Sequence, residues 1–160
     1  LLNEFGKLDG LVHNASILGT QMPIEQYDIK LWYSTIQINL NAPFMLTQFL
    51  IPALLKSDDA RIIFLSSTVG RKARAYWGAY SVSKFGIEGF AKTLSEELEK
   101  TQISVNTVNP GKLRTEMRRT AYPAEDSSTV PLPEEKSQAI VHLLSSSSPK
   151  INGEQLTISD

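Results

Sequence analysis

Cysteine is absent from the 160-residue sequence, and histidine occurs only as His13 and His142. The absence of cysteine excludes disulfides, thiolate metal sites and a cysteine nucleophile, and it fits a reducing compartment. Two histidines cannot form a multi-histidine site, so carboxylates alone would have to bind any metal ion. We therefore expect a cytoplasmic protein without a metal centre.

The sequence also lacks an excess of either charge and any long hydrophobic run. Its 16 Lys and Arg residues oppose 17 Asp and Glu residues, and the net charge of −1 argues against a dedicated nucleic-acid binder. The longest nearly apolar run, 42–55, is too short to span a membrane and contains Thr47, Gln48 and two prolines. Hydrophobic residues still make up 41% of the chain, enough for the core of one globular domain. We expect neither a nucleic acid nor a membrane as partner.

Apolar strand patterns alternate with helical patterns along the chain. Short apolar or β-branched runs predict strands at 8–15, 61–66, 103–108 and 154–158. Helical spacing predicts helices at 28–56, 78–100 and 134–144, the first of them kinked by Pro43 and Pro52. This alternation predicts an α/β fold, in which right-handed crossovers build a parallel sheet that helices cover on both faces.

Two segments fall outside the alternation. Residues 1–5 resemble the last turn of an amphipathic helix, and Gly6 stands where a helix C-cap is expected. Because a domain rarely begins with the end of a helix, we expect the sequence to be the C-terminal part of a longer protein. Residues 122–133 are polar and rich in Pro, Ser, Asp and Glu, which is typical of either a disordered linker or a mobile lid.

Candidate catalytic residues follow the strand at 61–66, because active sites of open parallel sheets lie at the carboxyl ends of the strands. Ser67 comes directly after this strand, and Tyr80 and Lys84 lie one helical turn apart on the predicted helix 78–100. A cation about 4 Å from the phenol in a partly dry site contributes about 4 kcal/mol, or about three pKa units. The spacing therefore predicts that Lys84 brings the pKa of Tyr80 toward neutrality, where a general acid–base works best. Taken alone, the pair also fits a half-buried tyrosine beside a solvated lysine.

Five motifs occur together in one order. They are His13-Asn14-Ala15-Ser16, Asn39 within 38–41, Ser66-Ser67-Thr68-Val69-Gly70, Tyr80-x-x-x-Lys84, and Asn109-Pro110-Gly111 with its continuation to Thr115. In this order and spacing the sequence resembles the classical short-chain dehydrogenase/reductase family over essentially its whole length. The stretches 44–48, 69–71 and 77–80 look most like the YciK-type oxidoreductases within that family.

The resemblance implies a Rossmann-type fold, a doubly wound parallel sheet in three α/β/α layers, and an NAD(P)-dependent oxidoreductase that interconverts a carbonyl and an alcohol. Residues 1–160 would be the C-terminal part of one NAD(P)-binding domain, with its N-terminal strands missing from this sequence. Tyr80 would be the acid–base, Ser67 would stabilise the substrate oxygen, and Lys84 would lower the pKa of Tyr80. Asn39 would complete the catalytic set by binding a water through its backbone.

The resemblance also implies ligands and partners. The residues that would bind NADP or NAD, with NADP favoured, are Asn14, Ala15, Tyr80, Lys84, Pro110, Gly111, Leu113 and Thr115. The substrate would be a small carbonyl or alcohol, and the long helices 28–56 and 78–100 would form the contact of a homodimer or homotetramer. The family's Gly-rich phosphate-binding turn is absent from the sequence. An alternative is therefore a truncated or degenerate, non-catalytic relative that acts as an interaction module.

Some residues depart from the family or stay outside its motifs. His13 and Ser16 replace an Asn and a Gly of the family's Asn-Asn-Ala-Gly motif, and we interpret His13 as a satisfied strand-end histidine. A basic cluster could recognise an anion, but solvated loop charge is the favoured interpretation. This cluster comprises Arg71, Lys72, Arg74, Arg114, Arg118 and Arg119.

Overall fold

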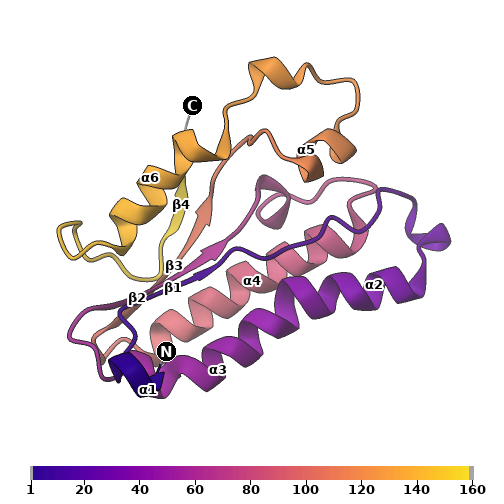
Figure 1. Cartoon of the computed structure of the whole chain (residues 1–160). Coiled ribbons are helices and arrows are strands. Elements are labelled where there is room, and N and C mark those ends of the chain that lie inside the picture. The colour runs from indigo at the N-terminus through magenta and orange to yellow at the C-terminus, as the bar shows by residue number, and fades with distance from the viewer. Residues whose placement is uncertain (1, 159–160) are drawn as a thin grey trace.

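A four-stranded parallel sheet forms the centre of the computed structural model, which describes residues 2–158 and their side chains from residue 4 onward. The strands follow one another in space as in sequence (Figure 1): β1 (Gly10–His13), β2 (Ala60–Leu65), β3 (Ile103–Asn109) and β4 (Gln155–Thr157). All three pairings are parallel, and β1 is an edge strand. Each of the four predicted strands is therefore confirmed, with small shifts at its ends.

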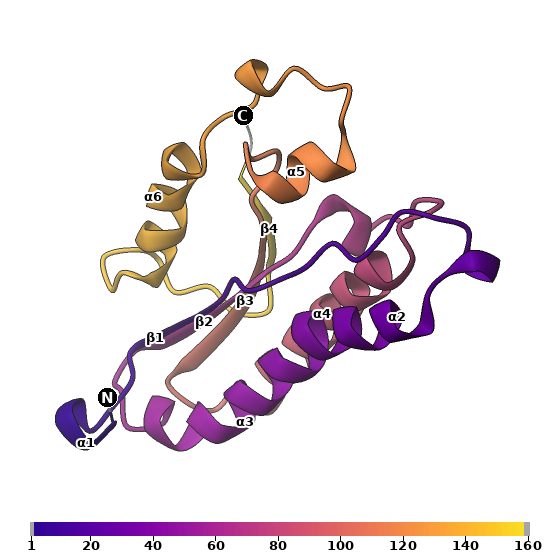
Figure 2. The same cartoon turned by 45° about the vertical axis from the view of Figure 1, so that its right-hand side comes forward.

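Helices cover both faces of this sheet. On one face, α2 (Ile29–Ile36), η2 (Gln37–Asn41) and α3 (Ala42–Leu54) run as one continuous rod beside α4 (Gly78–Glu97). The opposite face carries α6 (Pro133–Leu144), as Figure 2 shows. The predicted α/β class and its three layers are confirmed.

The shorter elements lie around these layers. They are α1 (Leu2–Phe5), η1 (Ile24–Gln26), η3 (Thr68–Gly70), α5 (Glu116–Ala121) and η4 (Ser127–Thr129). The predicted helix end at 1–5 is α1, apart from Leu1, which lies outside the described residues, and Gly6 has the positive φ of a C-cap. The sequence did not predict α5, which begins where the Thr115 side chain accepts a hydrogen bond from the Arg118 amide.

The rod that contains α2 and α3 changes its hydrogen bonding just before Pro43. The segment η2 is π-helical, and the Ala42 amide donates to the carbonyl of Gln37, five residues earlier. Pro43 has no N–H, so it cannot make the α-helical bond to the carbonyl of Asn39. The predicted irregularity at Pro43 is therefore a π-helical turn at Asn39, a residue of the predicted site.

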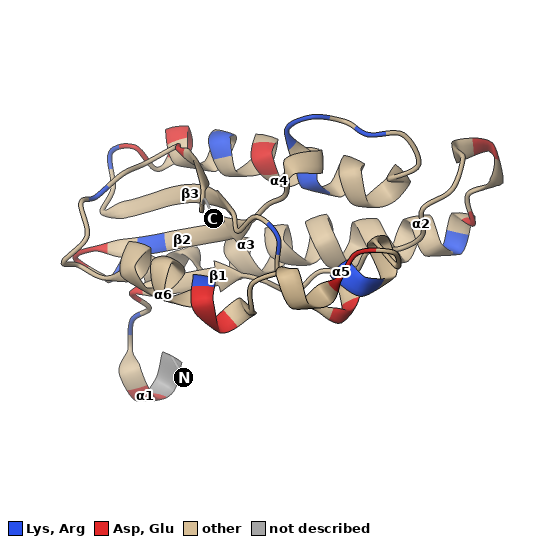
Figure 3. Cartoon of the chain, turned by 90° about the horizontal axis from the view of Figure 1, so that it is seen from above, with Lys and Arg blue, Asp and Glu red and all other residues tan. Residues whose placement is uncertain are grey.

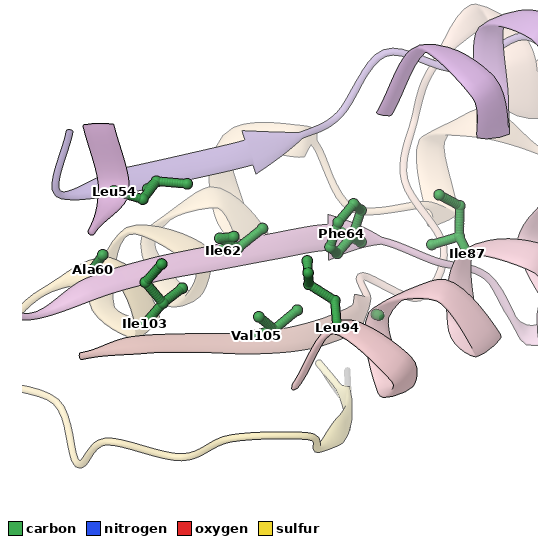
Figure 4. Close-up of a cluster of buried hydrophobic side chains, with 9 residues drawn as sticks. Leu54, Ala60, Ile62, Phe64, Ile87, Leu94, Ile103 and Val105 are labelled. Carbon is green, nitrogen blue, oxygen red and sulfur yellow. The ribbon is translucent and has the colours of Figure 1, made fainter. Parts of the chain in front are cut away.

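The main hydrophobic core lies between the sheet and the helices of one face (Figure 4). Ile62 and Phe64 of β2 and Val105 of β3 are fully buried there against Leu54 and Leu94 of the two long helices. A core of such bulky side chains contributes about 1.5–3 kcal/mol for each one buried. It fixes the strands against α4 and thereby the residues that follow the strand ends.

The segment 122–133 packs against the rest of the chain, so the alternative of a disordered linker is wrong. Val130 is buried, and the Arg114 side chain donates to the carbonyls of Val130 and Ser128 at 3.0 Å each. The Arg114 amide also donates to the Pro131 carbonyl. Arg114 thereby anchors the segment beside α5, beyond the carboxyl ends of the strands (Figure 1).

No helix within residues 2–158 has the length and apolar content needed to cross a membrane. Within the same part of the chain, no group of three or more His, Cys, Asp or Glu side chains is arranged to hold a metal ion.

Candidate active site

A cavity of about 410 Å³ opens at the carboxyl ends of β1, β2 and β3. It is lined by the segments that follow these strands and by residues of α4 and α5. Nine of the ten predicted site residues line this cavity, and they are Asn14, Ala15, Ser67, Tyr80, Lys84, Pro110, Gly111, Leu113 and Thr115. The structure therefore brings together the residues that the sequence motifs singled out.

Ser67, Tyr80 and Lys84 meet inside this cavity. Ser67 follows β2, and its side chain is hydrogen-bonded to that of Tyr80. Tyr80 and Lys84 lie one turn apart on α4 and are both buried. The Lys84 Nζ atom lies 5.6 Å from the centre of the Tyr80 ring and donates to the carbonyl of Leu65 at 2.8 Å.

The protonation of this pair differs from the sequence-based expectation. Burial raises the pKa of Tyr80 above its usual value of 10, and the hydrogen bond with Ser67 acts in the opposite direction but is the smaller effect. Burial also lowers the pKa of Lys84 to about 8, against the opposing effect of Glu88. In this structure burial therefore outweighs the predicted lowering of the Tyr80 pKa, and the Lys84 ammonium donates to the Leu65 carbonyl rather than to the phenol.

The loop that carries Ser67 is pressed against α4. A Cβ atom added at Gly70 would lie 2.7 Å from the Lys84 Cβ and 2.9 Å from the Lys84 backbone carbon. The Ser81 hydroxyl donates to the Val69 carbonyl at 2.6 Å, in the same contact. Only glycine allows so close an approach of two backbones, and this approach sets the distance between Ser67 and the Tyr80–Lys84 pair.

Asn39, the tenth predicted residue, lies behind the cavity and does not line it. Its side chain is fully paired: Oδ1 accepts from the Ile17 amide, and Nδ2 donates to the Ile17 carbonyl, both at 2.8 Å. Nδ2 also donates to the Ser83 hydroxyl at 3.1 Å. Asn39 thus fastens the segment after β1 to the helix that carries Tyr80 and Lys84.

The turn after β3 is built by Asn109. Its Oδ1 accepts from the Gly111 amide, and its Nδ2 donates to the Thr68 hydroxyl, both at 3.1 Å. Gly111 has a φ of +75°, and a Cβ there would lie 3.2 Å from the Ile158 carbonyl oxygen. Asn109 therefore ties the predicted cofactor-binding turn to the loop of Ser67.

Two unpaired hydroxyls fit a polar ligand in this cavity. The buried Oγ atoms of Ser16 and Ser66 line it and have no hydrogen-bond partner, and Ser66 is only 5% exposed. A buried hydroxyl without a partner is costly, and a ligand that binds it removes that cost. The hydroxyls and amides of the lining residues suit the carboxamide and ribose groups of a nicotinamide cofactor.

His13 stays outside this chemistry. Its Nε2 is hydrogen-bonded to the Thr47 hydroxyl at 2.8 Å, and its ring stacks on Phe64 at 4.6 Å. Burial lowers the pKa of His13 to about 4, so the ring is neutral at physiological pH. The interpretation of a satisfied strand-end histidine is confirmed.

Some arginines of the basic cluster form contacts within the fold, which the sequence did not predict. Arg71 binds Glu88 at 2.7 Å and also donates to Thr107, Thr157 and the Leu156 carbonyl. It therefore joins η3, α4, β3 and β4, and it is not a solvated loop charge. Its partners lie up to 86 residues away in sequence, so local pattern could not have found this role.

Other arginines of the cluster pair around α5. Arg74 donates to the Tyr122 hydroxyl at 2.8 Å, and Arg118 forms a two-pronged pair with Glu125, with both contacts at 2.7 Å. The interpretation as solvated charge is wrong for Arg118, which is only partly exposed, whereas Arg74 is exposed as expected for a loop charge. Sequence reasoning did not predict Trp77 and Tyr122 as site residues, although both line the cavity. They lie outside regular periodic patterns, so the sequence gives no signal of their position.

Comparisons with known proteins agree with this architecture. The family described as short chain dehydrogenase matches residues 1–126. The uncharacterized oxidoreductase YciK of Escherichia coli (strain K12) is 45% identical over 130 residues, which are 81% of this chain and 51% of that protein. The chain thus spans about half the length of this curated relative.

Solved structures are similar over nearly the whole chain. The structure of the E. coli oxidoreductase yciK matches with a TM-score of 0.92 and 40% identity, covering 97% of this chain and 63% of that one. A Shigella flexneri 2a protein complexed with NADP matches with a TM-score of 0.93 and 40% identity, covering 98% of this chain and 65% of that one.

Proposed function

The chain belongs to the short-chain dehydrogenase family, and on that premise we propose that the full-length protein is an NAD(P)-dependent oxidoreductase that interconverts a carbonyl and an alcohol. The observation that carries the proposal is the meeting of Ser67, Tyr80 and Lys84 at one cavity. Each supplies what carbonyl reduction needs, namely a donor to the oxygen, a proton and a nearby cation.

Tyr80 is the acid–base of the proposed reaction. Because burial raises its pKa, Tyr80 is protonated at neutral pH and can donate its proton to a carbonyl oxygen that becomes an alcohol. The Ser67 hydroxyl, hydrogen-bonded to Tyr80 in the free site, is positioned to donate to the same oxygen. The reverse reaction needs Tyr80 as a phenolate, so the protonation state favours reduction at neutral pH.

Lys84 and Asn39 support this proton donor. The Lys84 ammonium stabilises a phenolate by its charge after Tyr80 has given up its proton. Its pKa of about 8 leaves it mostly charged at neutral pH and able to exchange a proton near that pH. Asn39 holds the segment 14–18 and α4 in register through Ile17 and Ser83.

The proposed cofactor is NADP, because the similar Shigella flexneri structure is complexed with it. When bound, the cofactor supplies the hydride. Tyr80, Lys84, Asn14, Ala15 and residues of the turn 110–115, which line the cavity, would hold it. The unpaired hydroxyls of Ser16 and Ser66 would gain partners on binding.

We also propose a homodimer or homotetramer built on the two long helices. Large apolar side chains of α3 and α4 are exposed in the described single chain, and they include Phe44, Met45, Leu46, Phe49, Val82 and Phe85. Exposed large apolar side chains in this number are typical of an interface between copies. Phe49 is 73% exposed, so Phe49→Glu should lower the mass of the full-length protein in light scattering without unfolding it. A monomeric mass already in the wild type would contradict the proposal.

The alternative of a non-catalytic interaction module makes the opposite prediction for the same protein. It predicts an oligomer that neither binds NADPH nor oxidises it with any carbonyl compound. The unpaired hydroxyls and the Ser67–Tyr80 hydrogen bond favour the enzyme.

The test of the proposed function is Tyr80→Phe in the full-length protein. Phenylalanine keeps the ring packed on Trp77, 5.8 Å away, and removes only the hydroxyl. We expect NADPH affinity within about threefold of the wild type and a kcat that falls by about 100-fold or more, the usual effect of removing a general acid. Near-normal kcat in Tyr80→Phe would exclude Tyr80 as the proton donor.

A further inference from the structure

The part of the cavity beyond Tyr80 has apolar walls. Its residues come from the segment after β1, from the N-terminal end of α4, and from α5 and the residue that follows it, and they are Leu18, Trp77, Met117, Ala121 and Tyr122. The Trp77 ring lies 5.8 Å from the Tyr80 ring and 5.9 Å from the Tyr122 ring. A substrate whose carbonyl reaches Tyr80 therefore lies against Trp77 and the inner face of α5.

Arg118 is a charged residue beside these apolar walls. Lys84 and Arg118 are the only charged residues among the described ones that line the cavity, and Lys84 lies beside the predicted cofactor-binding residues. The Arg118 guanidinium stacks on the Tyr122 ring at 4.0 Å and binds both carboxylate oxygens of Glu125 at 2.7 Å. Glu125 lines a neighbouring cavity of about 310 Å³ on the far side of Arg118 and not the substrate cavity itself.

Two further arginines near α5 also contact partners within the chain. Arg119 binds Glu116 at 2.7 Å, and Arg74 donates to the Tyr122 hydroxyl while lying 5.9 Å from the Trp77 ring centre. Figure 3 shows positively and negatively charged positions close together at α5. Each of these guanidinium groups therefore has at least one partner within the chain.

We infer that the substrate is an uncharged carbonyl compound with a flat apolar group, and that the Arg118–Glu125 pair sets this specificity by excluding anionic carbonyl compounds. The inference rests on the proposed function, because it assumes that the carbonyl carbon is reduced at Tyr80. It assigns Arg118 and Glu125 as specificity-determining residues.

The physical reason lies in the double hydrogen bond. Glu125 binds Nε and Nη2 of Arg118 and compensates its positive charge, although the guanidinium keeps further N–H groups. A substrate carboxylate at this wall would therefore lose its hydration beside a cation whose charge is already compensated, or would have to displace Glu125. A neutral apolar group meets neither cost and gains contact with Trp77 and Tyr122.

The experiment compares two probes of nearly equal shape in the full-length protein with NADPH. Methyl benzoylformate is neutral, and benzoylformate carries a carboxylate in place of the ester. We expect the wild type to prefer the ester in kcat/KM by about tenfold or more, the usual effect of leaving a charged group unpaired. In Glu125→Gln, Arg118 is released from its anionic partner, and we expect the preference to fall by about tenfold through faster reduction of benzoylformate.

The matched control is Glu116→Gln, which removes the same kind of partner from Arg119. Arg119 does not line the substrate cavity and is largely exposed, so the preference should not change. Equal preference for the two probes in the wild type, or a Glu125→Gln variant that leaves the preference unchanged, would overturn the inference.

A binding measurement separates this inference from the proposed function. Calorimetric titration of the NADP-bound protein with each probe reports selectivity whether or not the probe is reduced. Selective binding of the ester without turnover would contradict the proposed function and support the role of the Arg118–Glu125 pair. Turnover of both probes with equal affinity would support the proposed function and contradict that role.

Discussion

The contact between Gly70 and Lys84 gives the sharpest test of how the fold positions the site. Gly70 has no positive φ, so alanine can adopt its backbone conformation. The added methyl group, however, would lie 2.7 Å from the Lys84 Cβ, 2.9 Å from its carbonyl carbon and 3.0 Å from its carbonyl oxygen. These atoms belong to or adjoin the α4 backbone, so they cannot move aside as a flexible side chain would. Gly70→Ala must push η3 away from α4.

The expected magnitude follows from overpacking. Forcing one extra methyl group into a tight contact costs about 1–3 kcal/mol of unfolding free energy. Because η3 begins at Thr68, the displacement also moves Ser67 away from Tyr80 and should lower kcat more than it raises the KM for NADPH. Gly89→Ala is the matched control, since no atom lies within 4 Å of the added Cβ and the residue lies inside α4. That variant should gain about 1 kcal/mol from helix propensity.

Urea unfolding of the full-length protein and both variants, followed by circular dichroism, measures whether each substitution lowers or raises the free energy of unfolding. We expect the midpoint to fall for Gly70→Ala and to rise for Gly89→Ala. A Gly70→Ala variant as stable and as active as the wild type would refute the argument that backbone proximity sets the Ser67–Lys84 geometry.

Two further predictions concern pH. Glu88 raises the pKa of Lys84, which is about 8. Glu88→Gln should therefore shift the alkaline fall in kcat/KM for carbonyl reduction from about pH 8 to lower pH. If the pH of this fall does not change, Lys84 is not the group that titrates there. His13 has a folded pKa of about 4 against 6.5 in the unfolded chain, so the wild type should lose stability as the pH falls from about 6.5 to 4. His13→Gln can keep the hydrogen bond to Thr47 without titrating, and its urea midpoint should vary less over that range; equal variation would assign the acid sensitivity to other groups.

The fold was predictable where the pattern is local. The run 61–66 is apolar on both faces because β2 is central and covered by helices on both sides, and its residues Ile62, Ile63 and Phe64 are buried. The helix α5 was not predictable in this way, because six residues rich in polar side chains show no apolar period. The π-helical turn at Asn39 depends on Pro43 and on packing against α4, which sequence spacing does not report.

The sequence predicted which residues line the site, but it did not predict their pKa values and ion pairs. Ser67, Tyr80 and Lys84 follow from motif spacing on strand ends and one helix face, and the structure places them at one cavity. The direction of the Tyr80 pKa shift did not follow, because burial in the folded chain is its main cause. The pairs formed by Arg71 and Arg118 likewise depend on tertiary contacts.

The most direct test of the account is isotope transfer from the cofactor. The full-length protein is incubated with NADPH carrying deuterium at the transferable position and with methyl benzoylformate, and the product is analysed by mass spectrometry. The account predicts an alcohol with one deuterium on the former carbonyl carbon in the wild type and essentially none in Tyr80→Phe. A wild-type protein that binds NADPH and the ester but forms no deuterated alcohol would contradict it.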